Sequence, residues 1–384
     1  MPSPPTAAAL IERLDFLKPQ LNAGNEDAKR EALILSRILT ICLNGPLNTA
    51  LEITVTAIDL NLFEFLVARN GPITTAELAT LSGGEELLIM RVFRLLASTG
   101  FLAEVDEQTW VATPVSQAMT IKEIAAGHRM IWELIMQGAL KAPKFLKETG
   151  YKCPENPNDG LVQYAFQTKL QTFQIIASNP ELLSDFNTFM GSTMGTRKFW
   201  LHWYPVQERI LNGASPGTPL IVDVGAGKGH DLIEFNAKFP GHRLVLQDLP
   251  QVVDNLPVLD QAIESCVYDF FTEQPLKGSR VYFYHHILHD WSDYKCLEIL
   301  SGLKSAMKPG YSLLLLHEMI VPEKGATAFH ALLDLNMMAL NSGMERTGKQ
   351  FTALLNKAGF EVIKIWLPES DPDANGIVEA MIKV

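Results

Sequence analysis

The chain has 384 residues, of which 47% are hydrophobic and 20% are charged, and its formal net charge is −11. This composition excludes a disordered or rod-like protein, and the length predicts two or three domains. A surface this acidic repels phosphate backbones, and we therefore expect no nucleic acid among the partners. No apolar stretch approaches the ~20 residues of a membrane span, and the N-terminus lacks the pattern of a secretory signal. Because the four cysteines are also far apart, we expect a cytoplasmic protein with reduced thiols and no membrane partner.

The first seventy residues are predicted to be helical and rich in apolar side chains. Apolar residues recur at helical spacing, as Leu10, Ile11, Leu14, Leu17, Leu33, Ile34, Ile38, Leu39, Ile41, Leu60, Leu62, Phe63 and Leu66. This is more apolar surface than one small domain covers, and a large exposed apolar patch usually marks an interface. The pattern therefore predicts a homodimer formed through the N-terminal helices.

A helix-turn-helix followed by a hairpin is predicted next. Residues 75–81 form a short helix capped by Thr74 or Thr75, residues 85–99 form an amphipathic helix, and residues 101–105 and 109–113 form the two strands. Together they predict a winged helix, a shape often used to bind DNA. Residues 55–120 carry three basic and eight acidic side chains, however. A polyanion is repelled by such a surface, so the charge favours a structural or dimerising module.

The chain changes character at the Gly- and Pro-rich segment 212–219. Beyond it, short apolar runs that read as strands alternate with helical windows. The predicted strands are 220–224, 243–246, 280–284 and 312–316, and the predicted helices are 231–239 and 291–307. This alternation predicts an α/β fold with a doubly wound, mostly parallel sheet, which binds ligands at the carboxyl ends of its strands.

The most informative stretch is Val222–His230, in which glycines directly follow the first predicted strand. These glycines are Gly225, Gly227 and Gly229. They let the backbone approach a ligand closely, although His230 stands where a dinucleotide-binding fingerprint requires a third spaced glycine. Asp248 ends the next strand and fits two ribose hydroxyls, while Asp269 and Phe270 fit an adenine. The stretch predicts an adenosine-containing ligand, with a glycine-rich turn without ligand as the alternative.

A second cluster lies after the strand 280–284. The segment Phe283–Ser292 contains the histidines His285, His286 and His289. Imidazole is suited to proton abstraction near neutral pH, and a carboxylate on its far nitrogen fixes the tautomer. Glu318 follows a strand at the same edge, and Glu345 follows an apolar helix. Further Cys or His ligands at zinc spacing are missing, so we expect no metal. Each residue alone also fits a plain structural role.

These motifs together resemble one family. They are Val222–Gly229, Gln247–Pro250, His289–Asp293, Met307–Gly310 and Glu345–Thr347. The chain resembles the small-molecule O-methyltransferases of the plant and fungal caffeate/isoflavone type that use S-adenosylmethionine, and its fungal branch in particular. The resemblance implies a Rossmann-like class I methyltransferase domain at 215–384. A helical and winged-helix dimerisation domain at 1–125 and a helical connector at 126–214 that lines the substrate pocket would precede it.

The resemblance also implies roles for individual residues. His289 would be the general base, flanked by Glu318 and Glu345. The cofactor S-adenosylmethionine would be bound by Asp223, Gly225, Gly227, Gly229, Asp248, Leu249, Asp269, Phe270 and His285. The substrate would contact Met130, Trp132, Met136, Phe166, Phe173, Trp203, Asp290, Met337 and Met338. The chain departs from the family at His285, where Lys or Arg is usual, and at Tyr268, where Gly is frequent.

The function implied by the resemblance is O-methylation of a phenol or enol on a small aromatic or polyketide-type secondary metabolite, without a metal. One alternative is a methyltransferase-like dehydratase or pericyclase that keeps S-adenosylmethionine bound and does not consume it. Only methyl transfer yields S-adenosylhomocysteine in step with product. A non-enzymatic winged-helix regulator is the third possibility, but it requires a basic recognition helix, which residues 85–99 do not provide.

Overall fold

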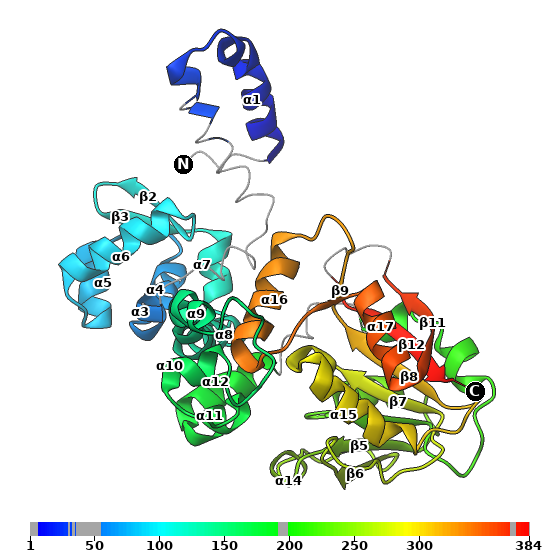
Figure 1. The fold of residues 1–384 in the computed structure, drawn as a ribbon. Coiled ribbons are helices and arrows are strands. Elements are labelled where there is room, and N and C mark those ends of the chain that lie inside the picture. The colour runs from blue at the N-terminus through cyan, green and yellow to red at the C-terminus, as the bar shows by residue number, and fades with distance from the viewer. Residues whose placement is uncertain are drawn as a thin grey trace. The chain divides into compact units, whose positions relative to one another are not determined.

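The computed structural model describes residues 7–29, 31–32, 35, 55–190, 199–368 and 374–383. The chain divides into two compact units (Figure 1). The helical unit comprises Met1–Trp132 and Glu181–Met190, and the sheet unit comprises Glu133–Pro180 and Gly191–Val384. The predicted division into three parts at residues 125 and 214 stays a prediction.

The helical unit contains the predicted winged helix. Its elements are α1 (Ala7–Asn22), α3 (Val55–Asp59), α4 (Leu62–Arg69), β1 (Ile73–Thr74), α5 (Thr75–Ser82), α6 (Glu86–Ser98), β2 (Leu102–Asp106), β3 (Thr109–Ala112), α7 (Pro114–Met119), α8 (Lys122–Met130) and most of α12 (Pro180–Met190). The strands form a small sheet in the order β1-β3-β2. Thr74 caps α5: its side chain accepts a hydrogen bond from the Glu77 backbone N–H, and the Glu77 side chain accepts one from the Thr74 backbone N–H.

Part of the N-terminal apolar surface is covered inside this unit. Leu62, Phe63 and Leu66 are fully buried in its core, together with Phe93 and Trp110. Leu33, Ile34, Ile38, Leu39 and Ile41, which the dimer prediction also uses, lie outside the described residues.

The sheet unit has the doubly wound architecture that the alternating pattern predicts. Its helices are α9 (Met136–Glu148), α10 (Leu161–Phe166), α11 (Thr172–Ser178), α13 (His230–Lys238), α14 (Pro250–Val253), α15 (Asp293–Lys304), α16 (Ala328–Asn341) and α17 (Gly348–Ala358). Its strands are β4 (Ile221–Val224), β5 (Leu244–Asp248), β6 (Ile263–Val267), β7 (Val281–His285), β8 (Leu313–Glu318), β9 (Ile320–Val321), β10 (Arg346–Thr347), β11 (Phe360–Trp366) and β12 (Gly376–Ile382).

Seven of these strands form one sheet in the order β11-β12-β8-β7-β4-β5-β6. All neighbours are parallel except at β12, which runs antiparallel to both β11 and β8. The prediction of a mostly parallel sheet is therefore confirmed. The predicted strands begin one residue early and end one or two residues early, except β4, whose end is correct.

Side chains on these strands alternate between two covered faces. Helices α15 and α17 lie side by side (Figure 1) on the face that carries Val222, Val224, Tyr282, Tyr284, Leu314 and Leu316. Helix α13 and the segment around Trp200 cover the face that carries Ile221, Leu244, Leu246, Phe283 and Leu315. By the same alternation, His285 and His317 lie on the α13 face, whereas Glu318 lies on the α15 face.

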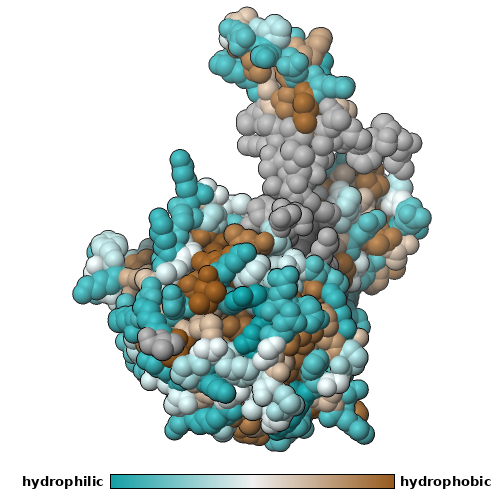
Figure 2. All heavy atoms as spheres, turned by 90° about the vertical axis from the view of Figure 1, so that its right-hand side faces the viewer, coloured by the Kyte–Doolittle hydropathy of each residue, from teal (hydrophilic) through white to brown (hydrophobic). Residues whose placement is uncertain are grey.

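Strand β11 is one of the two edge strands of this sheet, and β6 is the other. Strand β11 exposes Ile363, but its Lys364 is also exposed, and charged side chains on an edge strand oppose pairing with other chains. On the side of the molecule shown in Figure 2, hydrophobic residues form separate patches among hydrophilic ones. None of the described helices is both long and apolar enough to cross a membrane.

Candidate functional site

The glycine-rich loop joins β4 to α13 in a conformation that requires its glycines. Gly225, Gly227 and Gly229 all have positive φ, at 71°, 54° and 79°. A Cβ on Gly225 would lie 2.5 Å from Ile287 Cδ1, and one on Gly229 would lie 2.7 Å from Leu246 Cδ1. A Cβ on Gly227 would meet no heavy atom within 4 Å. The first and last glycines therefore serve packing, while the middle one lies beside open space.

Asp248 is held against this loop. Its Oδ2 accepts a hydrogen bond from the Gly227 N–H at 2.8 Å, and its Oδ1 accepts one from the Leu249 N–H at 2.7 Å. Burial raises the pKa of Asp248, and these two backbone bonds partly oppose that rise. Since a carboxylate oxygen accepts more than one hydrogen bond, each oxygen has capacity left for a ligand hydroxyl.

Asp223 is a buried carboxylate with an open oxygen. It is 1% exposed, and its Oδ1 has no hydrogen-bond partner among the described residues. Burial, and then the neighbouring charges of Asp231 and Asp248, raise its pKa well above the ordinary value. Such a group fits a ligand that brings a positive charge or donors of its own. The loop and these acids thus fit a nucleoside cofactor with a cationic group, such as S-adenosylmethionine.

His285 lies at the end of β7, beside the start of α13. Its Nδ1 is 2.7 Å from Asp231 Oδ2, and Trp200 Nε1 donates to Asp231 Oδ1 at 2.9 Å. Its ring also lies 4.1 Å from that of His317. Asp231, His285 and His317 offer ligand-type atoms that lie within 4.8 Å of one another. Both oxygens of Asp231 already have partners, Trp200 and His285. The absence of a metal stays a prediction.

The remaining cofactor residues lie at the neighbouring strand ends. Leu249 is 38% exposed directly after β5, and Asp269 follows β6, where its Oδ1 accepts a hydrogen bond from the Phe271 N–H. The Phe270 ring lies 3.9 Å from the Cβ position of Gly225. The structure therefore brings Phe270 to the glycine loop.

His289 lies in a short 3-10 turn, Leu288–Asp290, just after β7. Its Nδ1 is 2.8 Å from Glu345 Oε1, and its Nε2 is 3.7 Å from Asp290 Oδ1. Both His289 and Glu345 are buried. The structure thus brings together a histidine and a carboxylate that are far apart in the sequence, in the geometry of an oriented base.

Glu318 is placed differently from Glu345. Its Oε1 accepts hydrogen bonds from the backbone N–H groups of Ile287, at 3.1 Å, and Leu288, at 2.8 Å. Glu318 therefore holds the backbone that leads to His289. From the sequence we expected Glu318 to orient the imidazole itself.

The charges around His289 set its basicity. Burial alone would lower the pKa of His289, but the carboxylates of Glu345, Asp290 and Glu318 outweigh it and raise that pKa to about 10. Burial raises the pKa of Asp290 to about 6 and that of Glu318 to about 7, although the charge of His289 opposes both. The site thus favours a protonated imidazole among carboxylates.

The predicted substrate residues are distributed over both units. Met130 and Trp132 belong to the helical unit; Met136, Phe166, Phe173, Trp203, Asp290, Met337 and Met338 belong to the sheet unit. Asp290 contacts His289, and the Trp203 ring lies 6.2 Å from that of His317. Met130 and Met337 are buried, while Trp132, Phe166 and Phe173 are exposed. Only Asp290 and Trp203 are thus brought beside the histidines by a described contact.

Three further residues near His289 were assigned no role from the sequence. His286 stacks on His289 at 4.9 Å, adopts a left-handed backbone conformation with φ 54°, and bonds Asn375 through its Nε2. Arg346 and Asn341 bond the turn that carries His289. Arg346 directly follows Glu345, and this adjacency was the available signal.

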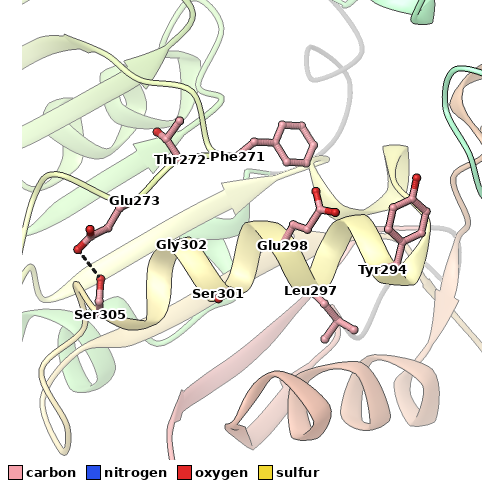
Figure 3. A pocket seen from close by; sticks show the side chains of 9 residues that line it. All are labelled: Phe271, Thr272, Glu273, Tyr294, Leu297, Glu298, Ser301, Gly302 and Ser305. Atoms are coloured by element: carbon pink, nitrogen blue, oxygen red, sulfur yellow. Dashed lines mark hydrogen bonds between the residues drawn. The ribbon is translucent and has the colours of Figure 1, made fainter.

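A separate surface hollow lies along α15 and contains none of the predicted site residues (Figure 3). It is lined by Phe271, Thr272, Glu273, Tyr294, Leu297, Glu298, Ser301, Gly302 and Ser305. Glu273 accepts hydrogen bonds from Ser305 and Lys277 there. The Glu273 carboxylate thus has partners within the protein. The predicted catalytic residues lie elsewhere, near the ends of β7 and β8.

Comparisons with known proteins identify the family. The O-methyltransferase domain matches residues 164–361, and the O-methyltransferase dimerisation domain matches residues 50–122. The chain is 49% identical to the O-methyltransferase penC of Penicillium thymicola over 384 residues, covering 97% of this chain and 96% of penC. The chain belongs to the O-methyltransferase family. It is an S-adenosylmethionine-dependent O-methyltransferase with a class I methyltransferase fold.

Two solved structures resemble this O-methyltransferase over its length. OxaC, in complex with SAH and oxaline, has a TM-score of 0.78 and 25% identity, covering 98% of this chain and 99% of OxaC. A protein described as a pericyclic reaction enzyme has a TM-score of 0.79 and 26% identity, covering 98% of this chain and all of the other. The same fold thus occurs in proteins described by different reactions, so the fold does not by itself select the reaction.

Proposed function

We propose that this O-methyltransferase methylates a phenol or enol hydroxyl of a small aromatic or polyketide-type metabolite, with His289 as the general base. The observation that carries the proposal is the buried His289–Glu345 pair. Because Nδ1 is held by Glu345, Nε2 is the nitrogen left to take the proton of the acceptor. S-adenosylmethionine, when bound, supplies the methyl group as an electrophile.

The basicity of His289 fits this class of acceptor. A phenol has a pKa of ~10, and the surrounding carboxylates raise the pKa of His289 to about 10. Proton transfer between groups of equal pKa is nearly thermoneutral, which favours removal of the proton as the oxygen attacks. The carboxylates of Glu345 and Asp290 also stabilise the imidazolium that forms.

The two glutamates divide the task of positioning His289. Glu345 holds Nδ1 and so selects the tautomer. Glu318 bonds the N–H groups of Ile287 and Leu288 and so holds the backbone that enters the turn. We infer that both position the base and that neither takes part in proton transfer.

The cofactor assignment combines the glycine loop with the acids around it. Asp248 would accept the ribose hydroxyls, and Asp223 would face the charged end of the cofactor, since its open oxygen is buried beside the loop. Gly227 would let the ligand approach closely. Asp269 and Phe270 would hold the adenine, and Leu249 and His285 would complete the pocket.

For the acceptor we propose a pocket beside His289 that is lined by apolar side chains. Asp290 would lie at its polar end, since it already contacts the base. The match to a fungal O-methyltransferase supports a small secondary metabolite as substrate. The match to the dimerisation domain over residues 50–122 supports a homodimer through the N-terminal helices, and we propose that it acts in the cytoplasm.

Product analysis tests the proposal directly. The protein is incubated with S-adenosylmethionine and a panel of phenols and enolic polyketides, and S-adenosylhomocysteine and methylated product are quantified together. The two should appear in equal amounts for an accepted substrate, and the His289→Ala variant should produce neither at a comparable rate. Product without S-adenosylhomocysteine would instead indicate a dehydration or pericyclic reaction and would contradict the proposal.

A further inference from the structure

The backbone of the turn that carries His289 is hydrogen-bonded to a single segment of the chain. The carbonyl groups of four consecutive residues, 288–291, all accept hydrogen bonds from residues 341–346. The donors are Arg346 Nη1 to Leu288, the Met344 N–H to His289, Asn341 Nδ2 to Asp290 and Arg346 Nη2 to Trp291. We call residues 341–346 the grip segment.

Arg346 makes two of these four bonds and is the largest group in the grip segment. Its side chain is fully buried, and each of its five N–H donors has an acceptor. Besides the carbonyls of Leu288 and Trp291, these acceptors are the Met344 carbonyl and Asp293 Oδ1. A lysine has three donors and no planar fork, so it is unable to reproduce this set.

Backbone geometry allows the grip segment to lie directly against the turn. A Cβ on Gly343 would lie 2.2 Å from the His289 carbonyl oxygen and 2.7 Å from the Asp290 carbonyl carbon. Only a residue without a side chain permits this approach. The grip segment also carries Glu345, whose backbone N–H is bonded to Asp334 Oδ1.

The two halves of the His289–Glu345 pair therefore belong to two segments that Arg346 joins. We propose that Arg346 is a positioning residue for methyl transfer, which keeps His289 Nδ1 on Glu345 by tying the catalytic turn to the grip segment. This inference rests on the proposed role of His289 as the base. It goes beyond that role because Arg346 touches neither the imidazole nor the Glu345 carboxylate in any described contact.

The reason for assigning this role to Arg346 is geometric. A general base has to be held within a fraction of an ångström, and a displacement of about 1 Å can cost ~100-fold in rate. His289 itself is bonded to the rest of the protein by one imidazole nitrogen and by its carbonyl group. Its position therefore also depends on the flanking carbonyls of Leu288 and Trp291, and Arg346 holds both of those.

The test compares Arg346→Met with wild type in the full-length protein. This variant keeps an unbranched side chain as far as the position of Nε, leaves the space of the guanidinium end open, and removes every donor. We expect kcat to fall about 10- to 100-fold, as for a displaced catalytic group, while KM and the calorimetric affinity for S-adenosylmethionine change little. The pH profile should also shift: once the imidazole leaves Glu345, its pKa falls, and the rise of kcat/KM moves to lower pH. Asp290, Glu318 and His286 also face this imidazole.

Added guanidinium ions provide a readout that a purely structural role would not move. They should restore part of the lost kcat in Arg346→Met by occupying the vacated site. Arg346→Lys is the second variant, for use also if Arg346→Met does not fold. It keeps the charge but lacks the fork, so we expect an intermediate kcat and an intermediate pH profile.

Arg280 is a matched control. It also ties backbone segments together, through the carbonyls of Arg209, Ile210 and Tyr311, but it lies just before β7, at the end of the strand opposite His285. Arg280→Met should lower the melting temperature without changing the pH profile or kcat of the folded fraction.

The possible outcomes separate this inference from the proposed function. If folded Arg346→Met or Arg346→Lys has the kcat and pH profile of wild type, or if Arg280→Met shifts the profile equally, Arg346 has no positioning role. If His289→Ala retains wild-type activity in the same assay, the proposed base is wrong and the inference falls with it. If His289→Ala loses most of its activity while Arg346→Met loses only stability, the inference about Arg346 is wrong and the proposed function stands.

Discussion

The two ends of the site differ in how their polar groups are satisfied. At the glycine loop, Asp223 Oδ1 and His285 Nε2 are buried without a hydrogen-bond partner among the described residues. At the turn that carries His289, Oε2 of Glu318 and Oε2 of Glu345 are likewise without a partner among the described residues. The backbone carbonyls and the imidazole Nδ1, however, all have partners in the protein. We therefore expect a ligand to complete the loop, whereas the backbone of the turn is already held by the chain itself.

This difference predicts two classes of variant. Changes at the loop should act on cofactor affinity, because Asp223 and His285 have open polar atoms there. Changes at the turn should act on the rate of the bound enzyme, because the groups there are already in place. The comparison fails if variants at the loop lower the rate at saturating cofactor, or if variants at the turn weaken cofactor binding.

The largest expected effect is that of His289→Ala. Removing a positioned general base usually lowers kcat by ~10²–10⁴. The affinity for S-adenosylmethionine should stay nearly constant, since His289 makes none of the described contacts with the glycine loop. Steady-state kinetics and calorimetry on the same preparation measure both quantities. His242→Ala, far along the chain from the turn, is the control and should behave as wild type.

Glu345→Gln should have the next largest effect and also change the pH dependence. A base acts only when neutral, so with a pKa of His289 of about 10, the wild-type kcat/KM should rise with pH across the neutral range. The variant loses the charge that raises this pKa most, so its rise should move down by about one unit or more. Its maximal rate should fall ~10–100-fold, because the tautomer is less well held.

A pH–rate profile of wild type and Glu345→Gln between pH 6 and the alkaline stability limit measures both changes. Identical profiles would mean that another group limits the rate. A rise that moves to higher pH in the variant would contradict the charges assigned to the site.

Much of this arrangement could be predicted from the sequence, because it depends on local patterns. The glycines between β4 and α13 and the acid at the end of β5 follow from short-range spacing, and the order of elements predicted which strand ends meet. The partner of each side chain could not be predicted in this way. Glu318 and Glu345 are the same residue type near the same edge, yet Glu345 reaches the imidazole and Glu318 reaches backbone N–H groups.

The physical reason is that the direction in which a side chain points depends on strand register and on packing between segments far apart in the sequence. Glu318 ends β8 and faces α15, whereas His317, one residue earlier, faces α13. The antiparallel insertion of β12 between β8 and β11 was missed for the same reason, since pairing direction is a property of the connection. The role of Arg346 is visible only when two segments far apart in the sequence are seen in contact.

Asp248→Ala should weaken cofactor binding and leave the turn unaffected. A charge-assisted hydrogen bond contributes ~1.5–3 kcal/mol, so the dissociation constant for S-adenosylmethionine should rise ~10-fold or more. At saturating cofactor, kcat should remain close to that of wild type. Calorimetric titration measures the affinity, and Asp254→Asn, an exposed acid shortly after it, is the matched control. An unchanged dissociation constant would place the ribose elsewhere.

The smallest expected effect is that of Asp223→Asn, which should change the stability of the protein and its affinity for the cofactor in opposite directions. Its pKa is raised above the unfolded value, so its ionisation opposes folding once the pH exceeds the unfolded pKa of ~3.9. Asp223→Asn removes this cost. The ligand-free variant should therefore melt a few degrees higher than wild type near pH 7, for a gain of ~1 kcal/mol, and the gain should vanish as the pH falls through ~4.

The same variant should bind S-adenosylmethionine more weakly, because the open oxygen that the cofactor would satisfy has lost its charge. Thermal melts with and without cofactor distinguish the two effects: the variant should melt above wild type without cofactor and gain less when cofactor is added. A variant that is less stable at every pH would show that Asp223 supports the fold. In that case the glycine loop would be completed by the chain, as the turn is, and the contrast between the two ends of the site would disappear.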